Sequence, residues 1–160
     1  MGEHQQISWG PGAVFAVPLP DGTAGLGQVT ELMMPNVVYC AFSSHRLPHG
    51  ARSAPILRPD AVIAALAVTR EQLDRGAWPI IGTQSVAWSR NQFANERYRS
   101  VGWVGAKIQD AGIAHDLLAA YFGLAPWDDW NDPTFLDGLL LRPELRPAKV
   151  RLKGSSDVGA

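Results

Sequence analysis

Residues 14–29 read VFAVPLPDGTAGLGQV, in which two short apolar runs flank the turn Asp21-Gly22. Glycine tolerates the positive φ that a tight hairpin turn requires, so this segment predicts a β-hairpin. Gly25 and Gly27 lack the third glycine and the following helix of a dinucleotide-binding loop. We interpret them as glycines that relieve crowding in a strongly curved sheet. The N-terminal part of the chain therefore predicts an antiparallel sheet.

Hydrophobic periodicity and turn residues predict the other elements. The apolar segment 61–68 is ambiguous between a helix and a strand. We assign it as a buried strand, because the capping-box pattern Thr69-Arg70-Glu71-Gln72 predicts that a helix starts directly after it, with Thr69 as the cap. Pro79 cannot donate to a sheet ladder and places its segment at a sheet edge or at the start of a strand. The predicted strands are 13–19, 24–32, 36–43, 61–68, 78–82 and a bent strand at 98–108. One predicted helix is 70–75, ended by Gly76; the other is 110–122, capped by Asp110 and ended by Gly123. Residues 43–59 are predicted to form an exposed loop.

These elements predict an α+β fold. Its curved, mostly antiparallel sheet of five to six strands should be SH3-like or a partly open barrel, with one main helix and long loops. The 160 residues, with 12 Pro and 16 Gly, suit one loop-rich domain over residues 1–153 and a disordered tail at 154–160. The predicted core consists of Phe15, Val17, Leu26, Val29, Trp78, Ile80 and Ile81.

The composition argues against several classes of protein. No apolar run approaches the roughly 18 residues that span a bilayer, and the first residues lack the pattern of a secretory leader. Cys40 is the single cysteine, so it forms no internal disulfide, and its apolar neighbours suggest a buried small hydrophobe. We therefore expect a cytoplasmic protein without a membrane partner.

The net charge of −1 is unevenly distributed. The first 137 residues carry 9 Lys and Arg against 13 Asp and Glu, a net charge of −4, and the last 23 carry a net charge of +3. A nucleic-acid binder usually concentrates basic and aromatic residues on one face, whereas the basic residues of the tail are sparse and lack aromatic neighbours. We do not expect nucleic acid as the partner.

No sequence motif for catalysis is present. The chain has no Gly-x-Ser-x-Gly elbow, no Walker loop and no His-Glu-x-x-His pattern. His45 and His49 have the spacing of helical metal ligands, but Pro48 between them argues against a helix. His115 and Asp116 are adjacent and do not face each other on a helix. We therefore predict no catalytic residue, no metal and no cofactor.

The segment Trp127-Asp128-Asp129-Trp130-Asn131-Asp132 is the sharpest candidate for a functional site. Its three carboxylates would suit a hard cation, but their spacing misses the EF-hand loop. Tryptophan is enriched at interface hot spots, and Asp128, Asp129 and Asp132 could steer a basic partner. In the alternative interpretation, the rings of Trp127 and Trp130 fold back onto the core and the Asp residues shape turns. We assign the five residues Trp127, Asp128, Asp129, Trp130 and Asp132 as the predicted partner-binding surface.

The hairpin at 12–29, the segment 69–82 and above all Gly76-Ala77-Trp78-Pro79-Ile80-Ile81-Gly82 resemble the immunity protein 26 family of bacterial polymorphic toxin systems. That family has a short strand ending in Pro-Leu, a second strand with Gly-x-Gly after a Gly-rich turn and, later, a Trp-x-Ile-Ile-Gly strand. The chain departs from the pattern at Pro79, and the residues after Asn91 follow no pattern of the family.

The resemblance implies a non-catalytic cytoplasmic protein that binds a cognate toxin domain and blocks it. The mildly acidic body of the chain agrees with a basic target. Two alternatives stay open at this point: a small enzyme with a His/Asp site in a concave pocket, and a nucleic-acid-binding barrel module.

Overall fold

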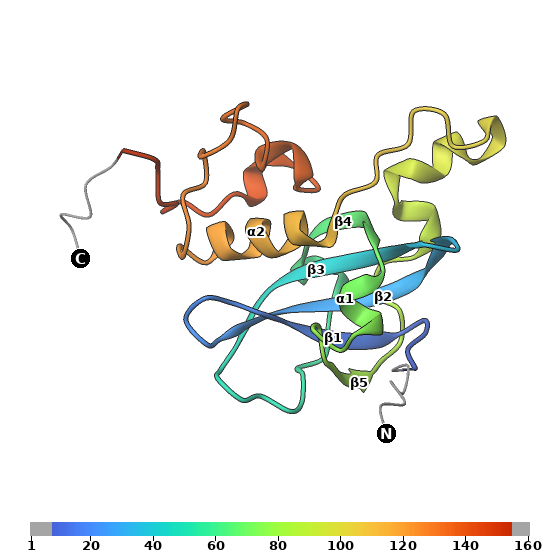
Figure 1. The fold of residues 1–160 in the computed structure, drawn as a ribbon, viewed down its shortest axis with the longest axis horizontal. Coiled ribbons are helices and arrows are strands. Elements are labelled where there is room, and N and C mark those ends of the chain that lie inside the picture. The colour runs from blue at the N-terminus through green and yellow to red at the C-terminus, as the bar shows by residue number, and fades with distance from the viewer. Residues whose placement is uncertain (1–7, 155–160) are drawn as a thin grey trace, which may run out of the picture.

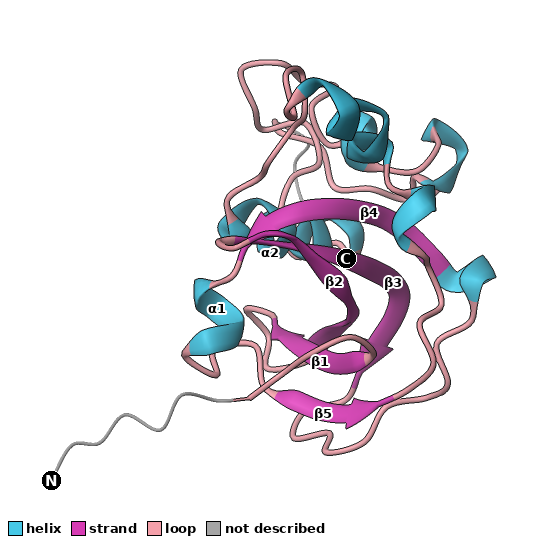
Figure 2. Ribbon diagram, turned by 90° about the vertical axis from the view of Figure 1, so that its right-hand side faces the viewer, coloured by secondary structure: helices cyan, strands magenta, loops and turns pink. Residues whose placement is uncertain are grey.

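One strongly curved sheet dominates the computed structural model, which describes residues 8–154 (Figure 1). All neighbouring strands are antiparallel, in the order β4-β3-β2-β1-β5, and the sheet stays open between its edges β4 and β5 (Figure 2). This arrangement confirms the predicted α+β class with a curved antiparallel sheet. The strands are β1 (Ala13–Pro18), β2 (Ala24–Met34), β3 (Val37–Leu47), β4 (Val62–Thr69) and β5 (Ile80–Thr83).

The predicted first hairpin joins β1 to β2, with Val14 opposite Gln28 and Pro18 opposite Ala24. Gly22 adopts a φ of +87° in its turn. A Cβ on Gly27 would lie 2.5 Å from Cζ of Phe15. The absence of a side chain there lets the Phe15 ring lie against the neighbouring strand, which confirms that this glycine relieves crowding.

The sheet is buried on both faces. On its inner face, Phe15 stacks on Trp78 at a centroid distance of 5.2 Å, and Phe42 meets both rings edge-on. The outer face is covered in two places, by the loop 48–58 next to Val14 and by residues 88–106 next to Tyr39.

The predicted core residues Phe15, Val17, Leu26, Val29 and Trp78 are buried. Ile80 and Ile81 are only half-buried, because β5 is an edge strand that starts directly after Pro79.

Helix α2 (Ala111–Tyr121) packs its apolar side against the inner face, as its sequence pattern predicts. Asp110 caps it by accepting the amide of Gly112 at 2.8 Å, and Gly123 follows with a φ of +80°. The short α1 is Glu71–Asp74. Five 3₁₀ helices complete the described part of the chain: η1 (Pro59–Ala61), η2 (Arg90–Gln92), η3 (Ala94–Val101), η4 (Asp137–Leu139) and η5 (Pro143–Leu145).

Three local predictions are wrong. The loop expected from residue 43 starts later, because β3 continues to Leu47 by backbone pairing with β2, which polar side chains do not prevent. Thr69 does not cap α1; its hydroxyl donates to Glu71 and accepts the amide of Ala111 at 3.1 Å. The bent strand expected at 98–108 is a 3₁₀ helix followed by turns, because Gly102 and Gly105 adopt positive φ angles.

The tail predicted at 154–160 lies outside the described residues except for Gly154. Among residues 8–154, no helix combines the length and apolarity needed to cross a bilayer.

Candidate functional site

The segment 127–132 places its aromatic rings inside the molecule. Trp127 is fully buried, and its indole N–H donates to Oδ1 of Asp137 at 3.1 Å. The ring of Trp130 is half-buried against Phe135 at a centroid distance of 4.8 Å. The side chain of Trp127 is thus not available to a partner in this structure. It has the packing role that the alternative interpretation gave it.

Each of the three carboxylates of the segment has a partner in the chain. Oδ1 of Asp128 accepts the amide of Lys153 at 2.6 Å, and Asp129 forms an exposed ion pair with the Lys153 ammonium at 3.2 Å. Asp132 accepts the hydroxyl and the amide of Thr134, and these hydrogen bonds lower the pKa of its carboxyl. Within residues 8–154, no group of three potential metal ligands is present. Of these three carboxylates, those of Asp129 and Asp132 are exposed.

The isolated candidates of the sequence are not brought together into a catalytic group. Nδ1 of His49 lies 2.9 Å from the carbonyl oxygen of Gly22 in an exposed turn, and His115 and Asp116 lie on the exposed side of α2. Cys40 is fully buried in the core, as predicted, and burial raises the pKa of its thiol. A thiol kept protonated in the core is not a nucleophile.

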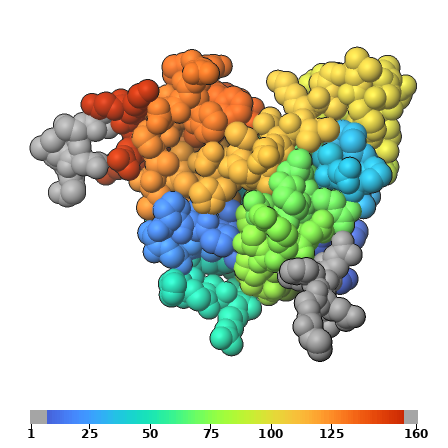
Figure 3. Space-filling view, viewed as in Figure 1, coloured from blue at the N-terminus to red at the C-terminus, as the bar shows by residue number. Residues whose placement is uncertain are grey.

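A hollow lies along the outer edge of β4, and sequence reasoning missed it. We call it the β4 groove; it has a volume of about 740 Å³. In the space-filling view, residues of the 90–107 region (yellow) and of the 124–145 region (orange) rise on either side of a hollow (Figure 3). Its floor contains Ala65, Leu66 and Ala67, one wall comes from residues 88–109, and the other wall comes from residues 138–142.

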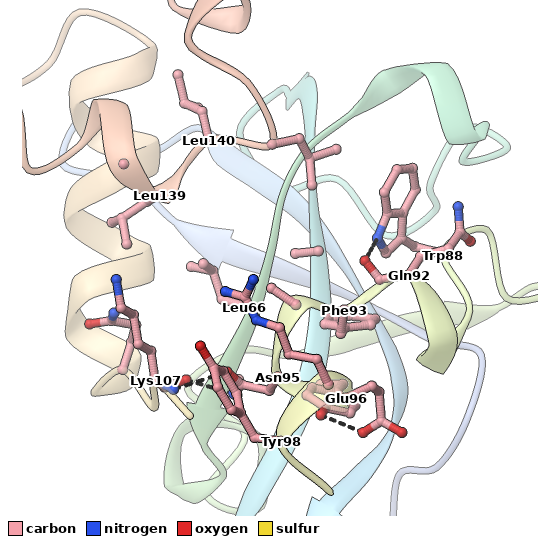
Figure 4. Close-up of a pocket in the computed structure, with 18 of the residues that line it drawn as sticks. Leu66, Trp88, Gln92, Phe93, Asn95, Glu96, Tyr98, Lys107, Leu139 and Leu140 are labelled. Carbon is pink, nitrogen blue, oxygen red and sulfur yellow. Dashed lines mark hydrogen bonds between the residues drawn. The ribbon is translucent and has the colours of Figure 1, made fainter. Parts of the chain in front are cut away.

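The close-up shows the two walls (Figure 4). Leu139 and Leu140 stand on one side, Trp88, Gln92 and Phe93 stand on the other, and Leu66 lies between them. The groove is thus apolar where its walls meet the strand.

A network around Glu96 holds the 88–109 wall against the sheet. Oε2 of Glu96 accepts the hydroxyl of Tyr39 at 2.7 Å, Oε1 accepts Nε of Arg99 at 2.9 Å, and Nε of Arg90 lies 3.2 Å from the same oxygen. Phe93 adds a stacking contact with the Tyr39 ring at a centroid distance of 4.3 Å. Tyr39 on β3 is therefore the anchor of this wall.

The electrostatics of the network favour one protonation state. Burial of Glu96 opposes ionisation, but hydrogen bonds from Arg99 and Tyr39 outweigh it, so the pKa of Glu96 lies below its usual range. Burial and the hydrogen bond to Glu96 both raise the pKa of Tyr39, which therefore remains a donor. The negative charge of Glu96 is therefore compensated by Arg90 and Arg99 within the 88–109 wall.

The far end of the same wall is fixed by Asn95. Its side-chain amide donates to the carbonyl oxygen of Lys107 at 2.7 Å, and its Oδ1 accepts the amide of Lys107 at 2.9 Å. These two bonds close the loop between η3 and α2 and hold the backbone of Lys107 beside the groove.

Three exposed basic residues line the β4 groove: Arg97, Lys107 and Arg142. Within residues 8–154, none of them forms an ion pair. The lining acid Glu96 is neutralised by Arg90 and Arg99. The groove thus presents a net positive charge. The sequence signal for it is the cluster of basic residues at 90–107, of which Arg99 and Lys107 lie within the strand predicted at 98–108.

The family model of immunity protein 26 matches residues 10–101, more than half of the chain. The chain belongs to the immunity protein 26 family. This confirms the resemblance drawn from the hairpin and the Trp-Pro-Ile-Ile-Gly segment. No curated protein and no solved structure gives a significant match to the chain.

Membership in an immunity protein family supports an immunity role without catalysis. The match to immunity protein 26 covers the whole sheet and η3. It ends before Lys107 and before the 138–142 wall of the β4 groove. The groove is therefore built partly from the shared scaffold and partly from residues outside the matched region.

Proposed function

We propose that this protein is a cytoplasmic immunity protein of a bacterial polymorphic toxin system, and that it binds a cognate toxin domain and blocks it without catalysis. The observation that carries the proposal is the match of the immunity protein 26 family over the sheet and η3. No cofactor is required, because inhibition consists of occupying a surface of the toxin. One immunity protein then neutralises one toxin molecule.

Co-expression tests this function. The toxin encoded beside the gene for this protein is expressed in a bacterial host with and without the protein, and growth and co-purification are measured. We expect restored growth and a stoichiometric complex, whereas an unrelated protein of similar size should give neither. Growth arrest despite abundant folded protein, together with no co-purification, would contradict the proposal.

The exposed carboxylates of the 127–132 segment are proposed to contribute to the partner-binding surface. Asp129 and Asp132 project into solvent, and a toxin with a basic surface would be steered toward them. The other three residues hold the segment in place: Asp128 accepts a backbone amide, Trp127 bonds to Asp137, and Trp130 packs against Phe135.

Replacement of both exposed carboxylates tests this assignment. The double variant Asp129→Ala and Asp132→Ala should weaken toxin binding by about tenfold at low salt. The matched control removes the exposed carboxylates of Asp60 and Asp116 instead. Equal affinity of the two double variants for the toxin would remove the 127–132 segment from the interface.

A further inference from the structure

The backbone of β4 has an unpaired stretch at its outer edge. The amide of Gln109 donates to the carbonyl oxygen of Ala67 at 2.8 Å, and the amide of Thr69 donates to the carbonyl oxygen of Gln109 at 3.2 Å. Farther along the strand, the amide of Leu141 donates to the carbonyl oxygen of Ile63 at 2.8 Å. Short segments from the two walls of the groove therefore cover both ends of this edge.

Between these two covered positions lies Ala65. The pairing of β4 with β3 is regular from Ala64 to Thr69, so alternate residues direct their backbone groups away from β3. Ala67 and Thr69 use backbone groups that point away from β3 to bond to Gln109. Because Ala65 is two residues before Ala67, its N–H and C=O also point away from β3. Among the described residues, no hydrogen bond reaches the N–H or C=O of Ala65 or the N–H of Ala67 across this edge.

This open edge lies on the floor of the β4 groove, where Ala65, Leu66 and Ala67 are lining residues. The distance from residue 63 to residue 67 along a strand is about 13 Å, which is enough for about three residues of an added strand. Unpaired strand edges are ready templates for another chain, and proteins usually cover them. Here the walls of the groove cover the edge at both ends and leave its centre open.

The walls indicate which kind of chain fits. Leu66, Leu139 and Leu140, which are mostly buried in the core, make the lining next to the edge apolar. The exposed charges of Lys107, Arg97 and Arg142 favour acidic side chains. A short extended peptide with at least one Asp or Glu satisfies both the backbone groups and the charge. This mode of recognition obtains affinity from main-chain hydrogen bonds and specificity from the side chains around them.

We propose that the β4 groove binds an extended acidic segment of the toxin as an added strand on the edge of β4. The inference rests on the proposed function, since the toxin supplies the segment. The backbone groups of Ala65 and the N–H of Ala67 pair with the segment, and the basic residues of the groove contact its carboxylates.

Two sets of variants test the groove, with the purified toxin domain encoded beside the gene as the probe. Ala65→Pro removes the outward N–H without removing a bond to β3, and a proline is tolerated on a strand edge. Ala65→Ser keeps the N–H and serves as its control. Lys107→Glu combined with Arg142→Glu reverses the charge of the groove. Arg52→Glu combined with Arg58→Glu, in the exposed loop 48–58 that packs on the sheet next to Val14, is the matched control.

We expect Ala65→Pro and the double charge reversal each to weaken toxin affinity by about tenfold or more, and the two controls to change it by less than about twofold. The loss caused by charge reversal should shrink as salt is raised. In the wild-type complex, hydrogen exchange of the amides of Ala65 and Ala67 should slow relative to the free protein. If Ala65→Pro does not fold, hydrogen exchange of these two amides decides whether the toxin pairs with the edge of β4.

The outcomes separate the groove from the function. If the wild-type protein neither binds nor neutralises the toxin, the proposed function fails and the groove inference fails with it. If the wild-type protein binds, but the groove variants bind equally well and the two amides keep their exchange rates, the groove inference is overturned and the function stands. Protection of the two amides in the toxin-free protein that rises with its own concentration would assign the edge to a second copy and also overturn the inference.

Discussion

Replacement of Gly27 by alanine should destabilise the fold, although alanine is usually the better residue. A Cβ at this position would lie 2.5 Å and 2.6 Å from two carbons of the Phe15 ring and 3.3 Å from the carbonyl oxygen of Ala41. Ordinary contacts between carbon atoms are about 3.5–4.0 Å, so the ring has to move by about 1 Å. It has little room to do so, because it is fully buried between Trp78 and Phe42.

The expected cost follows from two opposing effects. Overpacking a core costs about 1–3 kcal/mol, whereas exchange of Gly for Ala gains about 0.4–1 kcal/mol by restricting the unfolded chain. We therefore expect the free energy of unfolding to fall by about 1–2 kcal/mol, and the melting temperature to fall by about 2–4 °C for each kcal/mol. Gly82→Ala on β5 is the matched control, because nothing lies within 4 Å of its added Cβ.

Urea unfolding followed by tryptophan fluorescence measures both variants, and a double-mutant cycle identifies the cause. Phe15→Leu shortens the side chain that meets the new Cβ, so in the Gly27→Ala background it should cost at least about 1 kcal/mol less than in the wild-type protein. The explanation is refuted if Gly27→Ala and Gly82→Ala agree within about 0.3 kcal/mol, or if the cycle shows no coupling between residues 15 and 27.

Two further predictions concern the contacts that hold the 84–99 region to the sheet. Gln28 is fully buried; its amide donates to the carbonyl oxygen of Ser85 at 3.0 Å, and its Oε1 accepts the amide of Ala87 at 2.9 Å. Gln28→Leu should therefore lower the free energy of unfolding, measured by urea unfolding, by about 2–4 kcal/mol. A loss below about 0.5 kcal/mol would show that water replaces these partners. The pKa of Glu96 is lower in the folded protein than its ordinary value, so ionised Glu96 stabilises the fold above about pH 4.3, and this stabilisation is lost as the pH falls through the folded value. Melting temperatures between about pH 6 and about pH 3 should therefore fall more steeply for the wild-type protein than for Glu96→Gln, and parallel curves would exclude this role.

Local chemistry in the sequence accounts for the elements that were predicted correctly. The Asp21-Gly22 turn requires a positive φ, and the 3.6-residue period from Ile113 onward produces one apolar side, so the first hairpin and α2 follow from neighbouring residues. Pro79 likewise identifies an edge strand, because it has no N–H to donate. Each of these signals is complete within a few residues of chain.

The wrong predictions concern residues whose state depends on distant partners. Val101 and Val104 are apolar and suggested a strand, but both are exposed, since the turns at Gly102 and Gly105 redirect the chain. For Trp127 the sequence left two interpretations, and the structure shows its indole buried and bonded to Asp137. A side chain's burial depends on what packs over it, and the composition of its own segment does not contain that information.

The sequence by itself determined the sheet-forming hairpin, the main helix, the packing glycines and, through them, the resemblance to a family. Only the tertiary structure decided where the β4 groove lies. Its walls come from residues 88–109 and 138–142, and they meet at the edge of a strand formed by residues 62–69. Turns and amphipathic periods are local properties of a chain, whereas an open strand edge and its surrounding charge exist only after segments far apart in sequence have packed together.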